Sequence, residues 1–268
     1  MTDILLPAFL TSLVLLGIHS YFGIRIIQRN IIFTDLAIGQ MAAFGAAVSL
    51  IFLDGAYHYA ISVACALTTG LVIYYVSRRS KNLEAVIGLI YALGISGVFI
   101  LFSKSPKGME EFQNLMAYDI LFTQMKDMIA TGILYAFIGL FIFFVIGRTR
   151  GKISELLFFV TFAVTVTSSV RMAGVLVVFA ILLAPAFVAI QLTRIPFMPG
   201  AIKRYPLLTA WGIGTVTNMI AIVISYYGDM PTGYAIVFCN AFLAILTAIA
   251  VPAVQPGPGN GNGAAEGS

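Results

Sequence analysis

The sequence predicts an all-α polytopic membrane protein with about eight or nine transmembrane helices. Three observations lead to this fold class: of 268 residues 60% are hydrophobic, only 10% are charged, and the mean hydropathy is +1.00. Soluble domains carry about a quarter charged residues, so this composition excludes most soluble enzymes, disordered chains and solvated binding modules. The apolar runs do not alternate with a period of two, and lipid-exposed strands would leave backbone groups unpaired, so the spans are helices.

Nine apolar segments approach or reach the length of about 20 residues that crosses a bilayer. The sixth and seventh are the weakest division, because only Arg171 separates them and they could form one bent unit. Together the segments make up one transmembrane domain over 1–251. They lie at 4–27, 31–53, 58–77, 84–103, 128–147, 153–170, 172–192, 207–227 and 232–251.

Both ends of the chain differ from the spans. The first residues, Met1-Thr2-Asp3, lack the basic stretch of a signal peptide, so we expect the first segment to be retained. Residues 252–268 are rich in Gly, Pro and Asn and cannot pack a core. We expect a flexible tail there.

The basic residues indicate the orientation. With the N-terminus outside and the C-terminus inside, 11 of the 15 Lys and Arg residues fall at inner connections and 4 at outer ones. This bias follows the positive-inside rule, and the scattered placement excludes a nucleic-acid-binding stripe. The inner residues are Arg25, Arg29, Arg78, Arg79, Lys81, Arg148, Arg150, Lys152, Arg194, Lys203 and Arg204, and the outer ones are Lys104, Lys107, Lys126 and Arg171.

Three polar residues in the first two segments are candidate metal contacts: His19, Asp35 and Gln40. His19 lies about ten residues before the turn near Arg29 and Gln40 about eleven after it, so an antiparallel hairpin would place them at similar depth. Asp35 would lie about two helical turns nearer the cytoplasm. Imidazole nitrogen and carboxylate or amide oxygen are ligands that suit a transition metal.

Structural interpretations of the same residues remain open. His19 could simply form a hydrogen bond to a neighbouring helix, and Asp35 could cap the second helix, since it lies near its start. Asp35 and Gln40 are also five positions apart, which rotates them by about 140° around an ideal helix. They would face one point only if that helix were broken.

No catalytic constellation is visible. Residues 147–153 resemble a phosphate-binding loop only faintly, since the glycines are too close and Ile153 replaces the required hydroxyl. Cys65 and Cys239 lie within apolar runs and form neither a disulfide framework nor a CxxC motif. We therefore expect no enzyme activity and no bound cofactor.

Three blocks, by their order and spacing, resemble the ABC-3 family, the membrane permease subunits of bacterial zinc, manganese and iron ABC importers, which are type II importer-like. A Glu84-x-x-x-Gly88 pair adds to the resemblance. The blocks are IIFTDLAIGQMAAFGAAVSL at 31–50, RMAGVLVVFAILLAPAFVAIQLTR at 171–194 and YYGDMPTGYAIVFCNAFLAIL at 226–246.

The resemblance implies a multi-pass permease of the bacterial inner membrane that forms a homodimer, with the metal path between protomers. Zinc, manganese or iron would be cargo rather than cofactor. Two ATPase subunits would bind the cytoplasmic face, and a metal-binding protein would dock outside.

The chain departs from the family pattern in two places. Gln40 stands where the family has His, and Leu36 falls on the family Asp, with Asp35 one residue earlier. The inner connection at 147–155 is also too short for the coupling helix that the resemblance implies there, which leaves 194–204 as the longest inner connection. The alternative function is therefore an ATPase-independent membrane protein of the same fold, namely a channel, a secondary transporter or a structural subunit of a larger complex.

Overall fold

A computed structural model describes residues 2–80, 82–103, 105–107, 110–113, 120, 123–149 and 151–251. Within these ranges the regular structure is helical, and nine helices are long and apolar enough to cross a membrane. The predicted fold class is confirmed, whereas the predicted tail at 252–268 lies outside the described residues. The helices are α1 Thr2–Gln28, α2 Thr34–Phe52, α3 His58–Ser77, α4 Leu83–Phe102, α6 Met125–Phe141, continued by the π-helical turn η2 Ile142–Ile146, α7 Lys152–Ala173, α8 Val175–Thr193, the short α9 Gly200–Arg204, α10 Pro206–Gly228 and α11 Thr232–Ala250.

The sixth and seventh segments are separate helices, but they part at Gly174 rather than at Arg171. Gly174 has φ 81° and ψ 164°, a conformation open essentially to glycine alone. Arg171 lies in the last turn of α7, where a cation is favourable, and its guanidinium lies over the Tyr59 ring and 3.5 Å from an Asp127 carboxylate oxygen. A charged residue within an apolar run therefore marks a partnered side chain here and not a helix boundary.

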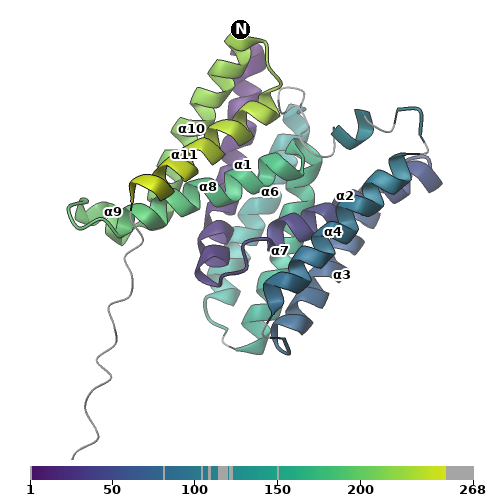
Figure 1. Cartoon of the computed structure of the whole chain (residues 1–268), viewed down its shortest axis with the longest axis horizontal. Coiled ribbons are helices and arrows are strands. Elements are labelled where there is room, and N and C mark those ends of the chain that lie inside the picture. Colours follow the sequence, from purple (N-terminus) through teal and green to yellow (C-terminus); the bar gives the residue numbers. More distant parts are fainter. Residues whose placement is uncertain are drawn as a thin grey trace, which may run out of the picture.

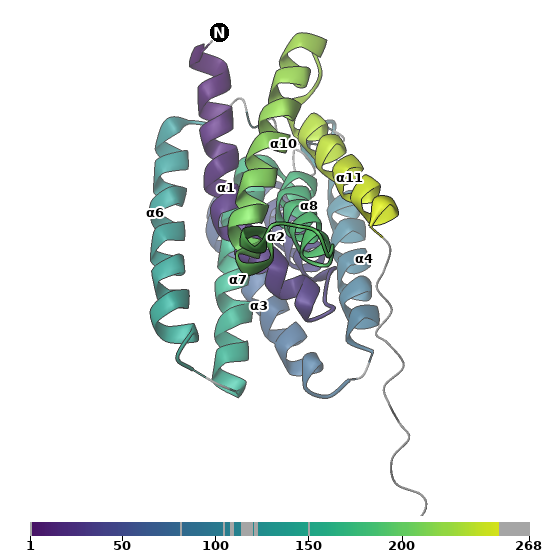
Figure 2. The ribbon, with the colours of Figure 1, turned by 90° about the vertical axis from the view of Figure 1, so that its left-hand side faces the viewer.

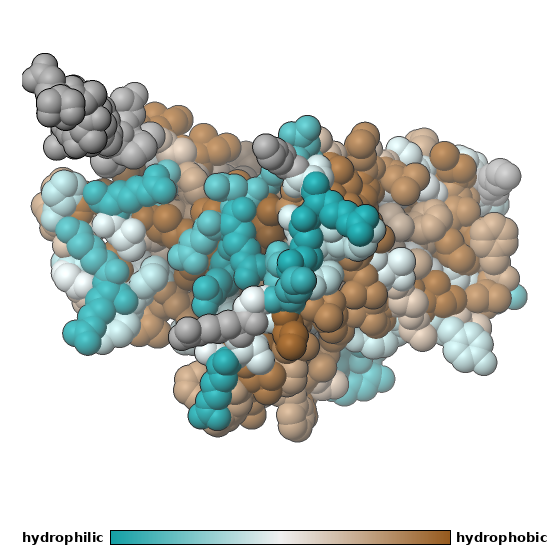
Figure 3. All heavy atoms as spheres, turned by 90° about the horizontal axis from the view of Figure 1, so that it is seen from below, coloured by the Kyte–Doolittle hydropathy of each residue, from teal (hydrophilic) through white to brown (hydrophobic). Residues whose placement is uncertain are grey.

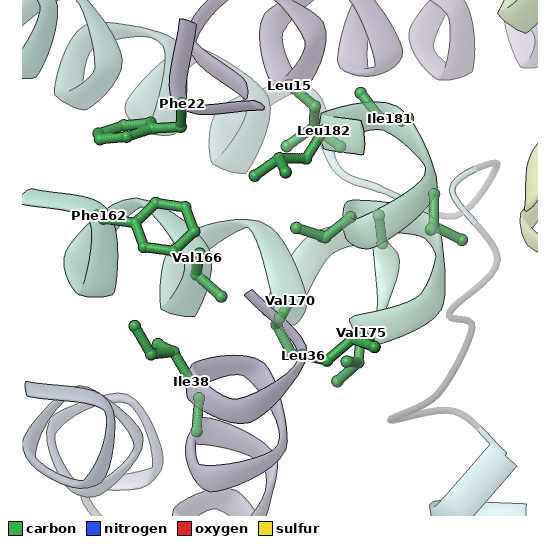
Figure 4. Close-up of a cluster of buried hydrophobic side chains, with 14 of the residues drawn as sticks. Leu15, Phe22, Leu36, Ile38, Phe162, Val166, Val170, Val175, Ile181 and Leu182 are labelled. Carbon is green, nitrogen blue, oxygen red and sulfur yellow. The ribbon is translucent and has the colours of Figure 1, made fainter. Parts of the chain in front are cut away.

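The helices form two packed groups that α7 joins (Figure 1). On one side α2 packs against α3 and α4, and on the other α8 packs against α1, α10 and α11. Figure 4 shows the interior where α1, α2, α7 and α8 meet. The side chains labelled there are Leu15, Phe22, Leu36, Ile38, Phe162, Val166, Val170, Val175, Ile181 and Leu182.

The predicted inner and outer connections lie on different sides of the molecule. In Figure 1 the connections after α1, α3, η2 and α8 lie toward the lower and left sides, and those after α2 and α10 lie toward the upper side. Seen from below, hydrophilic residues gather over part of the surface, beside broad apolar areas (Figure 3). A transmembrane bundle with one basic, water-facing side and apolar flanks has this arrangement of hydrophilic and apolar surface areas.

Helices α1 and α8 pack closely at Gly23. A Cβ atom at this position would lie 2.0 Å from the carbonyl oxygen of Leu182 and 2.9 Å from the Cβ atom of Ala186. Lipid tails provide no hydrophobic drive between helices, so close backbone packing at small residues is a main source of their association. Only glycine permits the observed distance between α1 and α8.

Replacing Gly23 should therefore destabilise the bundle. We expect Gly23→Ala to lower the free energy of unfolding by about 1–3 kcal/mol, the usual cost of overpacking. The measurement is thermal unfolding of the detergent-purified protein. The matched control is Gly17→Ala on the same helix, where a Cβ would meet nothing within 4 Å, so the substitution should be neutral or stabilising. Equal stability of the two variants would contradict this account of the α1–α8 contact.

Candidate metal site

His19 is fully buried in the middle of α1, and both of its ring nitrogens are engaged. Nδ1 lies 2.7 Å from the carbonyl oxygen of Leu15, and Nε2 lies 3.0 Å from Oγ of Ser169 on α7. A carbonyl oxygen can only accept, so Nδ1 carries the proton and donates to Leu15, while Nε2 lies within hydrogen-bond distance of the Ser169 hydroxyl, which also donates to the Thr165 carbonyl oxygen at 2.7 Å. The nitrogen that could bind a metal is thus occupied by α7.

This contact belongs to a buried polar network among α1, α6 and α7. The Tyr135 hydroxyl group on α6 bonds to Ser169, lies 3.1 Å from Oγ of Ser168 and donates to the Thr165 carbonyl oxygen at 3.3 Å. The Tyr135 ring also meets His19 edge-on, with 6.0 Å between centroids. The network satisfies polar groups that have no access to water, as the interior of a membrane protein requires. A hydrogen bond from His19 to a neighbouring helix was one of the open interpretations, whereas the other members were not predicted, although the pair Ser168-Ser169 was a visible signal.

Asp35 differs from His19 because nothing in the described chain satisfies it. Its side chain is buried at 1% exposure, and neither carboxylate oxygen has a hydrogen-bond partner there. It does not cap α2: the N-cap residue is Phe33, and no side-chain capping bond is present. A buried carboxylate without partners is expensive, so this position calls for a proton or a cation.

Gln40 is also fully buried, but it faces another helix. A Cβ built at Gly94 of α4 would lie 2.8 Å from the Gln40 Cβ atom, so this side of α2 lies against α4. Asp35 lies one turn before Gly39, whose face lies against Val170 and Val175. Because α2 runs unbroken from Thr34 to Phe52, the rotation of about 140° between Asp35 and Gln40 holds in the structure.

In this conformation Gln40 therefore lies against α4, on a different face of α2 from Asp35, while His19 contacts α7. Across the described residues, no group of three or more His, Cys, Asp or Glu side chains could hold a metal ion. A metal site at His19, Asp35 and Gln40 stays a prediction.

Some other polar residues of the helices have structural partners, whereas Oγ1 of Thr11, Oγ of Ser20 and Oε1 of Gln191 are buried without a hydrogen-bond partner in the described chain. Glu84 at the start of α4 accepts a hydrogen bond from the Ile32 amide at 2.9 Å, which fixes the turn before α2. Glu155 lies 3.6 Å from a guanidinium nitrogen of Arg78 and so joins α7 to α3. On the far side of the bundle, the Asn240 amide donates to the Asn218 side-chain oxygen at 2.8 Å and joins α11 to α10.

The network should contribute to stability through its interhelical bonds. We expect Ser169→Ala to lower the free energy of unfolding by about 0.6–1.7 kcal/mol, the range measured for hydrogen bonds between transmembrane helices. Thr167→Val is the matched control on α7, since the Thr167 hydroxyl donates at 2.8 Å to the Ala163 carbonyl of its own helix. A double-mutant cycle with His19→Leu measures the coupling, and a coupling of zero would contradict the His19–Ser169 bond.

Comparison with known proteins gives a family model and a relative that spans the chain. Residues 147–251 match the ABC 3 transport family. The high-affinity zinc uptake system membrane protein ZnuB of Haemophilus influenzae is 24% identical over 271 residues, which cover 92% of this chain and 97% of that protein.

Solved structures show the same fold. PsaBC from Streptococcus pneumoniae, in complex with a Fab, aligns with a TM-score of 0.67 and 19% identity over 90% of this chain and 89% of that one. An inward-facing transporter described as metal-chelate ABC type aligns with a TM-score of 0.64 and 15% identity over 91% and 87%. The agreement of family model, full-length relative and fold confirms the predicted resemblance of this chain to the ABC-3 family of membrane permeases.

Proposed function

We propose that this chain is the membrane permease subunit of an ABC importer for a divalent metal ion, namely zinc, manganese or iron, in a bacterial inner membrane. The observation that carries the proposal is the similarity to ZnuB, which extends over 97% of that protein. The chain itself would form the translocation path, while ATP hydrolysis would take place in a partner.

Asp35 is the residue we propose as the metal contact. Its carboxylate is buried and unsatisfied in the described chain, and carboxylate oxygen is a ligand for all three ions. Because His19, Asp35 and Gln40 are at most 1% exposed, a metal can reach them only when α2 moves relative to its neighbours. Such movement is what alternating access provides.

Removal of the carboxylate tests this role. We expect Asp35→Asn to lower zinc uptake roughly tenfold or more in cells that lack their own zinc importer, since even outer-shell metal residues cost about that much. His19→Ala and Gln40→Ala should also lower uptake if these residues complete the site. Uptake is measured with radioactive zinc and is normalised to the amount of protein in the membrane.

Glu155→Gln is the matched control, because it removes an acid whose partially exposed partner is Arg78. Such a pair contributes about 0–1 kcal/mol, so uptake should persist. Full uptake by Asp35→Asn would remove Asp35 from the metal path.

For the ATPase, we propose contact at the connection between α8 and α10. This segment holds α9 and presents Phe197 at 84% exposure, beside the basic residues Lys203 and Arg204. An exposed aromatic side chain beside basic residues is the kind of anchor that protein interfaces use. The connection between η2 and α7 has no helix among its described residues, 147–149 and 151, so it offers no comparable surface.

Copurification tests this contact and the rival function together. We expect an ATPase subunit to copurify with the chain in gentle detergent and to be lost from Phe197→Ala, because an aromatic anchor at an interface contributes about 2 kcal/mol or more. Tyr227→Ala is the control, since Tyr227 is 75% exposed at the end of α10 on the opposite side. Purification without any ATPase would favour the ATPase-independent channel, secondary transporter or structural subunit.

The implied homodimer and external metal-binding protein belong to the same proposal. The lipid-side surface of α11 exposes one apolar stripe at helical spacing, which a second protomer could cover. It consists of Phe238, Phe242, Ile245 and Ile249.

A further inference from the structure

A groove of about 1060 Å³ runs along α1, between this helix and the α6–η2 segment. In Figure 2, α6 stands at the edge of the bundle, beside α1 and α7. Small residues line the wall, and a Cβ at Gly17 or Gly139 would meet nothing within 4 Å. Arg25, Arg29 and Arg148 line the same groove, and we call it the arginine groove.

The apolar part of the arginine groove has the length of one bilayer leaflet. Leu13 and Arg25 both line it and are separated by about 18 Å along α1. One leaflet contributes about 15 Å of hydrocarbon. Between these two positions the wall is made of Val14, Gly17, Ile18 and Tyr21 on α1.

The charged end of the groove lacks an anion. Within the described chain, the ion pairs of arginine are Arg78 with Glu155 and Arg171 with Asp127, so none involves the groove. Arg29 lies over the Phe158 ring at 4.3 Å, a contact that orients the guanidinium group without neutralising it. Positive charges that lie together without a counter-ion repel one another. An anion bound at this end of the groove reduces that electrostatic repulsion.

An aromatic side chain accompanies this charged end. Tyr21 lies beneath Arg25, with 5.6 Å from Cζ to the ring centroid. Tyrosine concentrates at membrane–water interfaces, and the positive-inside bias assigns this interface to the cytoplasmic leaflet. Trp211, the single tryptophan, lines the apolar part of the groove, where its Nε1 donates to the Gly17 carbonyl oxygen at 2.9 Å.

We propose that the arginine groove binds one anionic phospholipid of the cytoplasmic leaflet. The head-group phosphate would accept hydrogen bonds from the arginines, whose planar donors match phosphate oxygens in pairs. An acyl chain would lie along α1 toward Leu13. Basic pockets between transmembrane helices on the cytoplasmic side are known to suit such head groups.

The test is native mass spectrometry of the full chain, with the subunits it retains, after delipidation and titration with phosphatidylglycerol or phosphatidylcholine. We expect phosphatidylglycerol to bind more tightly. The triple variant Arg25→Gln, Arg29→Gln, Arg148→Gln should lose affinity for it by roughly fivefold per arginine, the effect of one basic residue at an anionic membrane surface. The control is Arg78→Gln, Arg79→Gln, Lys152→Gln, which removes the same charge from the same side but outside the groove.

A second variant tests the apolar wall while it leaves every arginine in place. Gly139→Leu places a side chain into open space in the groove and should weaken the binding of phosphatidylglycerol, with no change in the melting temperature. The proposal is overturned if both triple variants lose affinity equally, since binding would then reflect surface charge alone. It is also overturned if Gly139→Leu binds phosphatidylglycerol as the unmodified chain does, or if phosphatidylcholine binds as tightly.

Discussion

The packing of α1 against α8 at Gly23 is the constraint on which the remaining features of the structure depend. With the α1 backbone held against the Leu182 carbonyl, α1 packs against α8, α10 and α6 and can present different residues to each neighbour. His19, one turn earlier, reaches Ser169 of α7. Gly17 and Arg25 line the groove toward α6. One close approach therefore fixes the buried network and the groove at once.

Among the metal candidates, His19 and Asp35 differ in the energetic cost of burying their side chains. His19 is satisfied at both nitrogens, so its burial needs no ligand. Asp35 is equally buried and has no hydrogen-bond partner in the described chain. An uncompensated polar group costs about 1–3 kcal/mol in protein measurements, and a charge costs more. Proteins retain an energetic cost of this kind where function requires it. Asp35 is therefore a stronger candidate for the metal contact than His19.

The sequence was sufficient for features that depend on solvent and local geometry. Hydropathy and span length predicted nine helices, and helix rotation predicted the separation of Asp35 from Gln40. The sequence was insufficient where the partner of a side chain lies far away along the chain. The partner of His19, Ser169, lies 150 positions away along the chain. The partners of the Arg171 guanidinium, Asp127 and Tyr59, lie on other segments of the chain. No local sequence pattern contains these contacts, so a hydrogen bond from His19 to a neighbouring helix remained one of several alternatives.

Membrane topology alone does not explain where the groove arginines lie. The positive-inside rule requires basic residues at inner connections, but it sets no demand on how they are arranged within that side. Arg25 and Arg29 come from the end of α1, and Arg148 comes from a connection more than a hundred residues later, yet all line one groove. Tyr135 bonds α6 to α7, while the small residues Gly132, Ala136 and Gly139 of α6 line the groove toward α1. An anionic lipid in this position would join α6 to α1 through both its phosphate and its acyl chain, and so complete a contact that the protein leaves partly open.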